Sequence, residues 1–424
     1  MRTYHIEGGY RLSGDVIIGG SKNAALAIIA AAMVVDGPCV IKNLPEIRDI
    51  DTLLTICADQ GAEVVRESKT CVRIDPRKIN THEAMQPLME AIRGSYYLLG
   101  ALLGRFGKVK LRMPGGCDFG SRPIDLHLKG FQALGAKTEV SHGYVTCEAD
   151  KLIGGSVFLD TVSVGATVNI ILAAVKAEGK TVIDNAAREP HIVDLANFLN
   201  AMGADIRGAG TDVIRVQGRP FLPANQEYAI IPDQIEAGTY MMMAPLTGGD
   251  IRVLDVIPKH MEPLSAKLKE MGAEVEEGEE SIRVSLPAGR KLKASSFKTM
   301  PYPGFPTDLQ PQAVVLQCVA EGTGRMLENV WENRYQYVDY LRMMGANILT
   351  SGKLAVIQGG TKLTGSKLRA RDLRAGAAMV MAALAAEGTS VIEEVEKIER
   401  GYEFFVEKMR KIGAEIKVVE NNSI

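Results

Sequence analysis

The feature that most constrains the fold is a stretch of about 70 residues that recurs six times along the chain. A Gly-Ala pair followed by alternating apolar and polar residues marks each copy, and the intervals between the pairs are 74, 68, 69, 73 and 68 residues. The six glycines are Gly61, Gly135, Gly203, Gly272, Gly345 and Gly413. Because self-similarity at a fixed period is the signature of a repeated structural element, six copies of one element are expected.

Each glycine follows a segment with helical spacing. An apolar residue stands four positions before every one of them, namely Cys57, Phe131, Leu199, Leu268, Leu341 and Met409. Residues four apart share one face of a helix, and glycine is the usual left-handed residue that ends one. The residues after the glycine, as in AEVEE, alternate like a strand. We therefore predict an amphipathic helix that ends at each glycine and is followed by a strand.

An earlier segment of each repeat is rich in alanine and leucine and is apolar nearly all round. The six segments are AALAIIAAAMV, YYLLGALLG, GATVNIILAAV, GTYMMMAPL, QAVVLQCVA and GAAMVMAALAA. A helix of this kind is buried on every side. Each repeat is thus predicted to be strand, buried helix, strand, amphipathic helix and strand, a mixed α/β element. Six copies exceed one core, so two groups of three are expected.

Composition excludes several other classes of protein. Hydrophobic residues make up 46% and charged residues 24%, as in ordinary globular proteins. Lys and Arg total 49 against 51 Asp and Glu, so neither nucleic acid nor an anionic membrane is expected as a partner. The longest apolar run, 24–35, has 12 residues and is too short to span a bilayer. The first ten residues lack a secretory pattern.

Cofactor and metal motifs are missing from the sequence. The six cysteines form no CxxC pair and the six histidines have no zinc-site spacing, so no metal site is expected. Reduced thiols in a cytoplasmic protein are the simplest interpretation. The segment GGSKNAA (19–25) places Lys22 after two glycines but lacks the spacing of a P-loop, and no GxGxxG follows a strand.

Basic residues recur before the second helix of every repeat, at Arg48, Arg122, Arg188, Lys259, Arg334 and Arg400. Polar or charged residues also precede the buried helices, at Lys22 and Asn23, Arg93, Ser163, Asp233, Asp308 and Arg374. Cations at helix N-termini worsen the local charge balance unless an anion binds there. A solvated cap or a salt bridge explains any single one of them. The sixfold recurrence favours an anionic substrate.

Two residues are candidates for chemistry. Cys117 lies among glycines in the segment 111–127, five residues before Arg122, and such a cysteine is exposed and prone to form a thiolate. Most cysteines are inert buried residues, so both interpretations stay open. Asp308 in FPTDLQPQ stands at a helix start, where capping is the simpler explanation and general base catalysis the alternative.

At these positions the sequence resembles a known family. The motifs SKNAAL, PGGCDFGSRPIDLH, SVGAT, NAAREP, FPTD, ENR, DLR and ERGY, in this order, are similar to those of the UDP-N-acetylglucosamine 1-carboxyvinyltransferase family of enolpyruvyl transferases. The resemblance spans the whole chain. It implies a two-domain inside-out α/β barrel with buried helices surrounded by sheets. One domain would hold 21–230, the other 1–20 and 231–424, with the active site in the cleft between them.

The resemblance also implies a reaction. The enolpyruvyl group of phosphoenolpyruvate is transferred to the 3′-hydroxyl of UDP-N-acetylglucosamine and phosphate is released, which is the first committed step of peptidoglycan precursor synthesis. No metal or organic cofactor is implied. Cys117 would protonate phosphoenolpyruvate and would be the target of the inhibitor fosfomycin, and Asp308 would accept the hydroxyl proton. Lys22 and Arg400 complete the implied catalytic set.

The same resemblance implies the residues that bind each substrate. Those for phosphoenolpyruvate are Lys22, Asn23, Arg122, Arg374 and Arg400. Those for UDP-N-acetylglucosamine are Arg93, Arg122, Pro123, Ile124, Asp125, Leu126, Thr161, Val162, Ser163, Val164, Asp308 and Val330. Many relatives carry a basic residue at the position of Thr161. Many also have the motif PDRIE where residues 232–236 of this chain read PDQIE, so that Gln234 stands in place of the arginine. Arg48, Arg188 and Lys259 lie outside the matched motifs and are predicted to be structural or electrostatic.

Two alternatives to this function are kept. One is a transferase of the 5-enolpyruvylshikimate-3-phosphate synthase kind, a sister family with the same sixfold architecture but without the cysteine segment. The other is a nucleotide-sugar-binding relative without activity. The presence together of Lys22, Cys117, Asp308 and Arg400 favours an enzyme, because binding alone needs neither an acid nor a base.

Overall fold

The computed structural model describes residues 2–113 and 124–420. These residues form two compact units. Unit I comprises 20–113 and 124–231, and unit II comprises 2–19 and 232–420. The chain passes from one unit to the other between Gly19 and Gly20 and again between Ile231 and Pro232.

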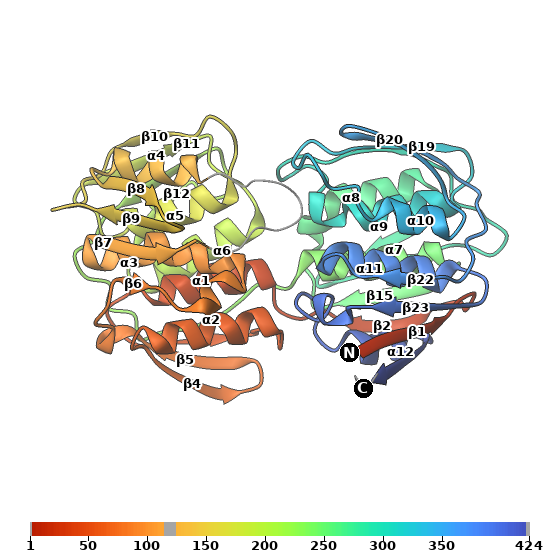
Figure 1. The fold of residues 1–424 in the computed structure, drawn as a ribbon, viewed down its shortest axis with the longest axis horizontal. Helices are drawn as coiled ribbons and strands as arrows, with labels where there is room; N and C mark the ends of the chain where they lie inside the picture. The colour runs from red at the N-terminus through yellow and green to blue at the C-terminus, as the bar shows by residue number, and fades with distance from the viewer. Residues whose placement is uncertain (1, 114–123, 421–424) are drawn as a thin grey trace. The chain divides into compact units, whose positions relative to one another are not determined.

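In unit I, helices lie inside and sheets outside (Figure 1). The buried helices are α1 (Lys22–Ala32), α3 (Tyr97–Phe106) and α5 (Val164–Ala174), and the amphipathic ones are α2 (Arg48–Asp59), α4 (Asp125–Ala133) and α6 (Pro190–Ala201). The strands, in order across each sheet, are β14 (Glu227–Ala229), β3 (Cys39–Lys42), β5 (Cys71–Asp75) and β4 (Glu63–Ser68); β6 (Glu83–Ala84), β7 (Lys108–Arg112), β9 (Tyr144–Glu148) and β8 (Lys137–Ser141); and β10 (Ser156–Phe158), β11 (Lys180–Asp184), β13 (Val213–Gln217) and β12 (Asp205–Arg207).

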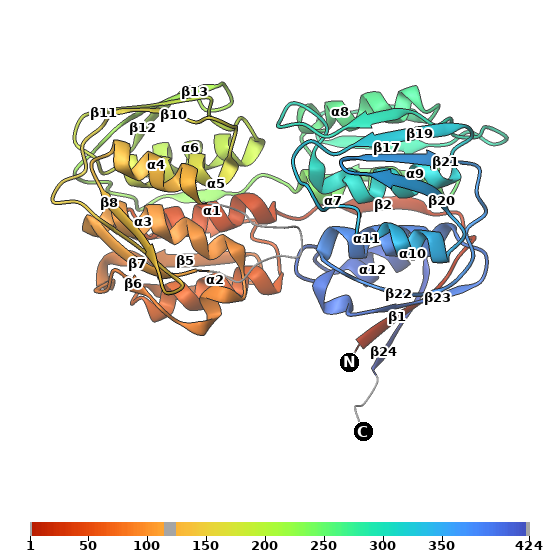
Figure 2. The ribbon, with the colours of Figure 1, turned by 45° about the horizontal axis from the view of Figure 1, so that its top comes forward.

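Unit II repeats this plan, and its buried helices lie between its sheets in Figure 2. These helices are α7 (Gln234–Leu246), α9 (Gln310–Val319) and α11 (Leu373–Ala385), with α8 (Pro258–Glu270), α10 (Val338–Met343) and α12 (Phe405–Lys411) as the second set. Its sheets are β2 (Ser13–Ile17), β15 (Asp250–Leu254), β17 (Ser281–Ser285) and β16 (Glu274–Glu277); β18 (Ser296–Lys298), β19 (Thr323–Leu327), β21 (Leu354–Gln358) and β20 (Asn347–Ser351); and β22 (Lys367–Arg369), β23 (Thr389–Glu393), β1 (Arg2–Glu7) and β24 (Glu415–Glu420).

All six sheets formed by the described residues share one pairing pattern. In the order given above, the first two strands pair in parallel and the other two pairings are antiparallel. The last sheet is completed by β1, so the two ends of the chain close one repeat together. The predicted inside-out α/β architecture of six repeats is confirmed.

The six glycines end their helices as predicted. Their φ angles are 99°, 91°, 103°, 97°, 99° and 98°, in chain order, which is the left-handed region that glycine adopts without strain. The apolar residue four positions earlier is 0% exposed in every repeat. The periodic pattern therefore located the inner face of each amphipathic helix correctly.

The sequence underestimated the number of strands. One strand was predicted after each glycine, whereas each of the first five glycines is followed by two antiparallel strands, and the strand after the sixth, β24, pairs with β1. Strands β8 and β9, for example, are joined by His142 and Gly143. The φ angles of these two residues are 51° and 80°, as in the tight turns of β-hairpins. Alternation continues on both sides of so short a turn, which is why the sequence pattern was taken for a single strand.

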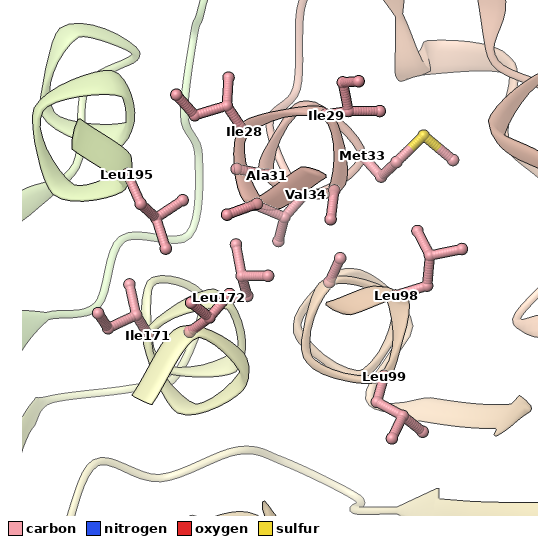
Figure 3. Close-up of a cluster of buried hydrophobic side chains, with 14 of the residues drawn as sticks. Ile28, Ile29, Ala31, Met33, Val34, Leu98, Leu99, Ile171, Leu172 and Leu195 are labelled. Atoms are coloured by element: carbon pink, nitrogen blue, oxygen red, sulfur yellow. The ribbon is translucent and has the colours of Figure 1, made fainter. Parts of the chain in front are cut away.

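The core of unit I depends on close contact between buried helices. In Figure 3 the apolar side chains of α1, α3 and α5 meet, with Leu195 of α6 beside them. Helix α3 contacts α5 at Gly100, whose amide donates to Asn169 Oδ1 at 2.8 Å. A Cβ on Gly100 would lie 2.2 Å from the backbone oxygen of Asn169. A side chain at this position would force the two helices apart.

Two glycine substitutions separate this packing role from the helix-ending role. Gly100→Ala is expected to destabilise unit I by about 3 kcal/mol or more, because a methyl group is forced against backbone. Gly272→Ala is expected to cost about 1 kcal/mol, because its φ of 97° strains alanine while the nearest neighbouring atom is 4.0 Å away. Denaturant unfolding measures both. Equal losses would contradict the packing argument.

Candidate active site

Lys22 is the first residue of α1 and is buried. It is 7% exposed, and its Nζ lies 2.7 Å from Oδ2 of Asp49, which is 4% exposed. Asp49 lies in the first turn of α2, where the helix dipole stabilises a carboxylate. Asn23 follows and is half-buried. Asp49 was not predicted from the sequence, since nothing local indicates a partner for Lys22 on the next helix.

Several of the residues predicted to bind the nucleotide-sugar lie in unit I, on segments that are brought together by three contacts. Arg93 begins the short 3₁₀ helix η3 (Arg93–Tyr96), and a Cβ on the next residue, Gly94, would lie 2.8 Å from the side chain of Leu26 in α1. The Tyr96 ring lies 6.4 Å from that of His127 in α4. A Cβ at Gly165 in α5 would be 2.8 Å from His127 Nε2. The beginnings of α1, η3, α4 and α5 are therefore neighbours.

These residues differ in accessibility. Asp125 and Thr161 are exposed, Ile124 is buried, and the remaining ones are half-buried, namely Arg93, Leu126, Val162, Ser163 and Val164. The Ser163 hydroxyl caps α5 by accepting a hydrogen bond from the Ala166 amide at 3.3 Å. Cys117, Arg122 and Pro123 lie outside the described residues.

His127 packs against this group of residues as a neutral side chain. Burial lowers the pKa of His127 to about 4. The charge of Asp125 acts against this shift, and the charge of Arg93 adds to it. Its Nδ1 is buried and has no hydrogen-bond partner among the described residues. An uncharged imidazole fits such surroundings, and protonation would place an unpaired charge there.

This burial predicts a pH dependence of stability. An unfolded histidine takes up its proton near pH 6.5. Between pH 6.5 and 4 the unfolded chain therefore binds more protons than the folded chain, and the free energy of unfolding decreases as the pH is lowered. The loss attributable to His127 is expected to reach about 2–3 kcal/mol at pH 4.5. Chemical unfolding of the wild type and of His127→Gln at pH 7 and 4.5 tests this. The variant should lose less stability on acidification, and an equal loss would refute the assignment.

In unit II, Asp308 lies between two buried arginines. It is the middle residue of the 3₁₀ helix η4 (Thr307–Leu309), and its side chain is 31% exposed. Oδ1 lies 3.2 Å from Arg334 Nη2, and Oδ2 lies 3.1 Å from Arg374 Nε. The arginine side chains are 4% and 3% exposed. The carboxylate thus has a charge environment that capping alone would not require.

Apart from its pair with Asp308, Arg374 contacts a network of buried polar groups. Asp372 caps α11 and accepts from the Arg374 amide at 2.8 Å, while the guanidinium carbon lies 5.5 Å from the centre of the Tyr402 ring. The Tyr402 hydroxyl lies 3.1 Å from Oγ1 of Thr239 and accepts from Gln312 Nε2 at 3.2 Å. Burial works against the charged form, yet Asp308 and Tyr402 raise the pKa of Arg374 above its usual value.

The other predicted residues of unit II are only partly enclosed. Val330 is 37% exposed and Arg400 is half-buried in the turn before α12. Arg334 was not among the predicted site residues, although its position in the repeat matches those of Arg122 and Arg400. That match, together with the ENR motif, was the signal available in the sequence.

The remaining basic residues of the repeat make surface contacts. Arg48 is exposed, Arg188 pairs with Asp212 at 3.5 Å, and Lys259 pairs with Glu262 at 2.7 Å within one helix. Exposed pairs of this kind contribute little to stability. Arg48, Arg188 and Lys259 are therefore still predicted to have a structural or electrostatic role.

Three further findings apply to residues 2–113 and 124–420. None of the helices in these ranges is both long and apolar enough to cross a membrane. Within the same ranges, no three side chains of His, Cys, Asp or Glu are grouped so that they could hold a metal ion. The five cysteines described there are free; four are buried and Cys71 is half-buried.

Comparison with known proteins identifies the family. Residues 6–409 match the sequence model of the family described as EPSP synthase (3-phosphoshikimate 1-carboxyvinyltransferase). The chain belongs to this family of enolpyruvyl transferases. It is 52% identical to UDP-N-acetylglucosamine 1-carboxyvinyltransferase 2 from Clostridium acetobutylicum, over 97% of this chain and 98% of that one. It is 50% identical to the UDP-N-acetylglucosamine 1-carboxyvinyltransferase from Halothermothrix orenii, over 99% and 100%.

Solved structures show the same fold. The enolpyruvyl transferase NikO from Streptomyces tendae superimposes with a TM-score of 0.89 at 28% identity, covering 98% of both chains. EPSP synthase from Acinetobacter baumannii gives a TM-score of 0.78 at 21% identity, covering 99% of this chain and 100% of the other. At that identity the second likeness concerns the fold alone.

Proposed function

We propose that this chain transfers the enolpyruvyl group of phosphoenolpyruvate to the 3′-hydroxyl of UDP-N-acetylglucosamine and releases inorganic phosphate. The observation that carries the proposal is an identity of 50–52% over nearly the full length to relatives named for this transfer. The reaction would supply a peptidoglycan precursor in the cytoplasm. Lys22 in unit I, and Asp308 with its two arginines in unit II, have the charged and acid–base groups that this reaction needs.

Binding of phosphoenolpyruvate requires cations, because the molecule carries a phosphate and a carboxylate. Lys22 and Arg374 are buried cations that already hold carboxylates, and Arg400 is half-buried. Buried cations bind anions more strongly than exposed ones because less water competes. We propose that these side chains, with Asn23 and Arg122, bind the phosphate and the carboxylate of phosphoenolpyruvate.

The reaction is an addition followed by an elimination. Cys117 donates a proton to the methylene carbon of phosphoenolpyruvate, and Asp308 accepts the proton of the sugar hydroxyl as its oxygen bonds to C2. The thiolate of Cys117 then takes a proton back from the methyl group of the adduct, the bond from C2 to the phosphate oxygen breaks, and the leaving phosphate takes the proton from Asp308. The enolpyruvyl ether and inorganic phosphate result. Arg334 and Arg374 fix the two oxygens of Asp308, so that it is oriented before the acceptor binds.

The acceptor would lie along the beginnings of α4 and α5. The segments that carry Arg93, residues 124–126 and residues 161–164 come together there through the contacts of His127 with Tyr96 and Gly165. Thr161 is exposed and uncharged. Val330 is proposed to contact the sugar. The alternative acceptor, shikimate 3-phosphate, has the support of the family description and of the fold, whereas full-length relatives at 50% identity support UDP-N-acetylglucosamine.

Phosphate release tests the proposal. Purified protein is incubated with phosphoenolpyruvate and UDP-N-acetylglucosamine, and each substrate is omitted in turn. Phosphate is expected only when both are present, in an amount equal to the enolpyruvyl product found by mass spectrometry. Release without the nucleotide-sugar would indicate a phosphatase, and binding without release would indicate the inactive relative.

Alkylation by fosfomycin tests the role of Cys117. Burial raises the pKa of Cys39, Cys57, Cys147 and Cys318 to about 12, and burial with Glu67 nearby raises that of Cys71. These five thiols are therefore poor nucleophiles at neutral pH. Peptide mapping is expected to find a single adduct, at Cys117, formed faster when UDP-N-acetylglucosamine is present.

Two variants accompany that experiment. Cys117→Asp keeps an acid and is expected to retain turnover and resist the inhibitor, whereas Cys117→Ser is a much weaker acid and should turn over more slowly. Modification chiefly at any of the other five cysteines would overturn the assignment.

A further inference from the structure

Glu328 is a buried carboxylate to which the proposed reaction gives no task. It directly follows β19 and is 0% exposed. Oε1 accepts hydrogen bonds from the Thr299 hydroxyl at 2.9 Å and from the amides of Val330 and Trp331 at 2.8 and 3.0 Å. Oε2 accepts from the Thr307 hydroxyl at 2.9 Å. Four neutral donors thus bind one carboxylate.

Three of these bonds join two segments that meet at Asp308. The first segment contains Thr307, which is the residue immediately before Asp308 in η4. The second begins with the two amides bound by Glu328 and leads to Arg334, which pairs with Asp308 at 3.2 Å. The Thr299 hydroxyl also accepts from the Asn329 amide at 2.9 Å. One side chain therefore links the backbone of Asp308 to the backbone that carries its partner.

Filling this buried position does not require a carboxylate, because an apolar side chain could also occupy it. Removing a charge from water is costly, and apolar replacements of buried charged groups are often as stable as the originals. Hydrogen bonds from hydroxyl and amide groups to a carboxylate are, however, short and directional. Such bonds define the positions of both segments more narrowly than apolar contacts would.

We propose that Glu328 is a positioning residue that fixes Asp308 relative to Arg334 through Thr307 and the amides of 330–331. The inference rests on the proposed function in assigning Asp308 the role of base. Misplacement of a reacting group by about 1 Å can cost on the order of 10²-fold in rate. Loss of the link should therefore lower kcat and affect KM much less.

Thr307 allows the link to be cut without removing the carboxylate. Thr307→Val has nearly the same shape and lacks the hydroxyl, and we expect kcat to fall about 10-fold, with KM for both substrates changed by less than about 3-fold. Thr307→Ser restores the hydroxyl and should recover most of the lost kcat. Thr323→Val, at an exposed hydroxyl on the same β19, is the matched control and should behave as the wild type.

A double variant distinguishes positioning from general damage. In an Asp308→Asn background, Thr307→Val should lower kcat no further, because it acts through Asp308. The proposal would be overturned if the double variant lost kcat by the product of the two single losses. It would also be overturned if Thr307→Val alone kept the kcat of the wild type.

A second measurement does not depend on turnover, so that failure of the proposed function is distinguishable from failure of this inference. Amide hydrogen exchange in 305–309 and 329–334 should become faster in Thr307→Val and stay unchanged in Thr307→Ser and Thr323→Val. Unchanged exchange in Thr307→Val would overturn the positioning role even if the protein had another activity.

Discussion

Replacing Asp308 with asparagine is expected to lower kcat by about 10²–10⁴-fold, the range for loss of a general base. Asparagine keeps the size but only one of the two acceptor oxygens, so that only one of Arg334 and Arg374 keeps its hydrogen-bond acceptor. Asp308→Ala should lose as much activity and more stability, because it removes the remaining acceptor oxygen as well as the counter-charge of the two buried guanidiniums. Binding of UDP-N-acetylglucosamine, measured by calorimetry, should weaken far less than kcat falls.

The control for this variant is Asp339→Asn. Asp339 also pairs with an arginine, Arg342 at 2.8 Å, but its side chain is 79% exposed. That variant should match the wild type in both activity and stability, as exposed ion pairs contribute little. If Asp308→Asn kept its kcat and lost only stability, the carboxylate would be structural.

Replacing Lys22 with methionine is expected to lower kcat/KM for phosphoenolpyruvate by at least about 10²–10³-fold, the effect of removing one charged or polar group that stabilises a transition state. It should also destabilise unit I by about 3–5 kcal/mol, because the buried carboxylate of Asp49 loses the ammonium group that lies 2.7 Å from it. Activity is therefore compared at a temperature where the variant is folded, as judged by circular dichroism.

A second change separates the two effects of Lys22. In Lys22→Met/Asp49→Asn both charges of the buried pair are removed, so most of the stability should return while activity should not. Recovery of activity along with stability would mean that Lys22 acts only through folding, and its proposed role in binding phosphoenolpyruvate would then be wrong.

The repeat could be predicted because it depends on local patterns. A glycine that ends a helix, an apolar residue four positions earlier and a helix apolar on all sides each follow from neighbouring residues, and the structure confirms them at Gly61, Cys57 and α1 and at their five counterparts. The hairpins were missed because alternation does not change where two strands meet in a tight turn.

The ion pairs of the site could not be predicted in the same way. Arg334 and Arg374 lie 26 and 66 residues from Asp308 in the sequence, and only the packing of repeats brings the three together. Asp49 is on the helix after that of Lys22, and Glu328 has no pattern that marks a buried carboxylate. Residue type suggested anion binding, while the partners that hold each charge depend on tertiary structure.

The acceptor is the central claim, and a competition experiment tests it most directly. Phosphoenolpyruvate is incubated with the protein and equal concentrations of UDP-N-acetylglucosamine and shikimate 3-phosphate, and the products are identified by mass spectrometry. We predict the enolpyruvyl ether of UDP-N-acetylglucosamine, phosphate in equal amount, and no shikimate product above the level of a protein-free control. Formation of the shikimate product in preference to the nucleotide-sugar product would contradict the account.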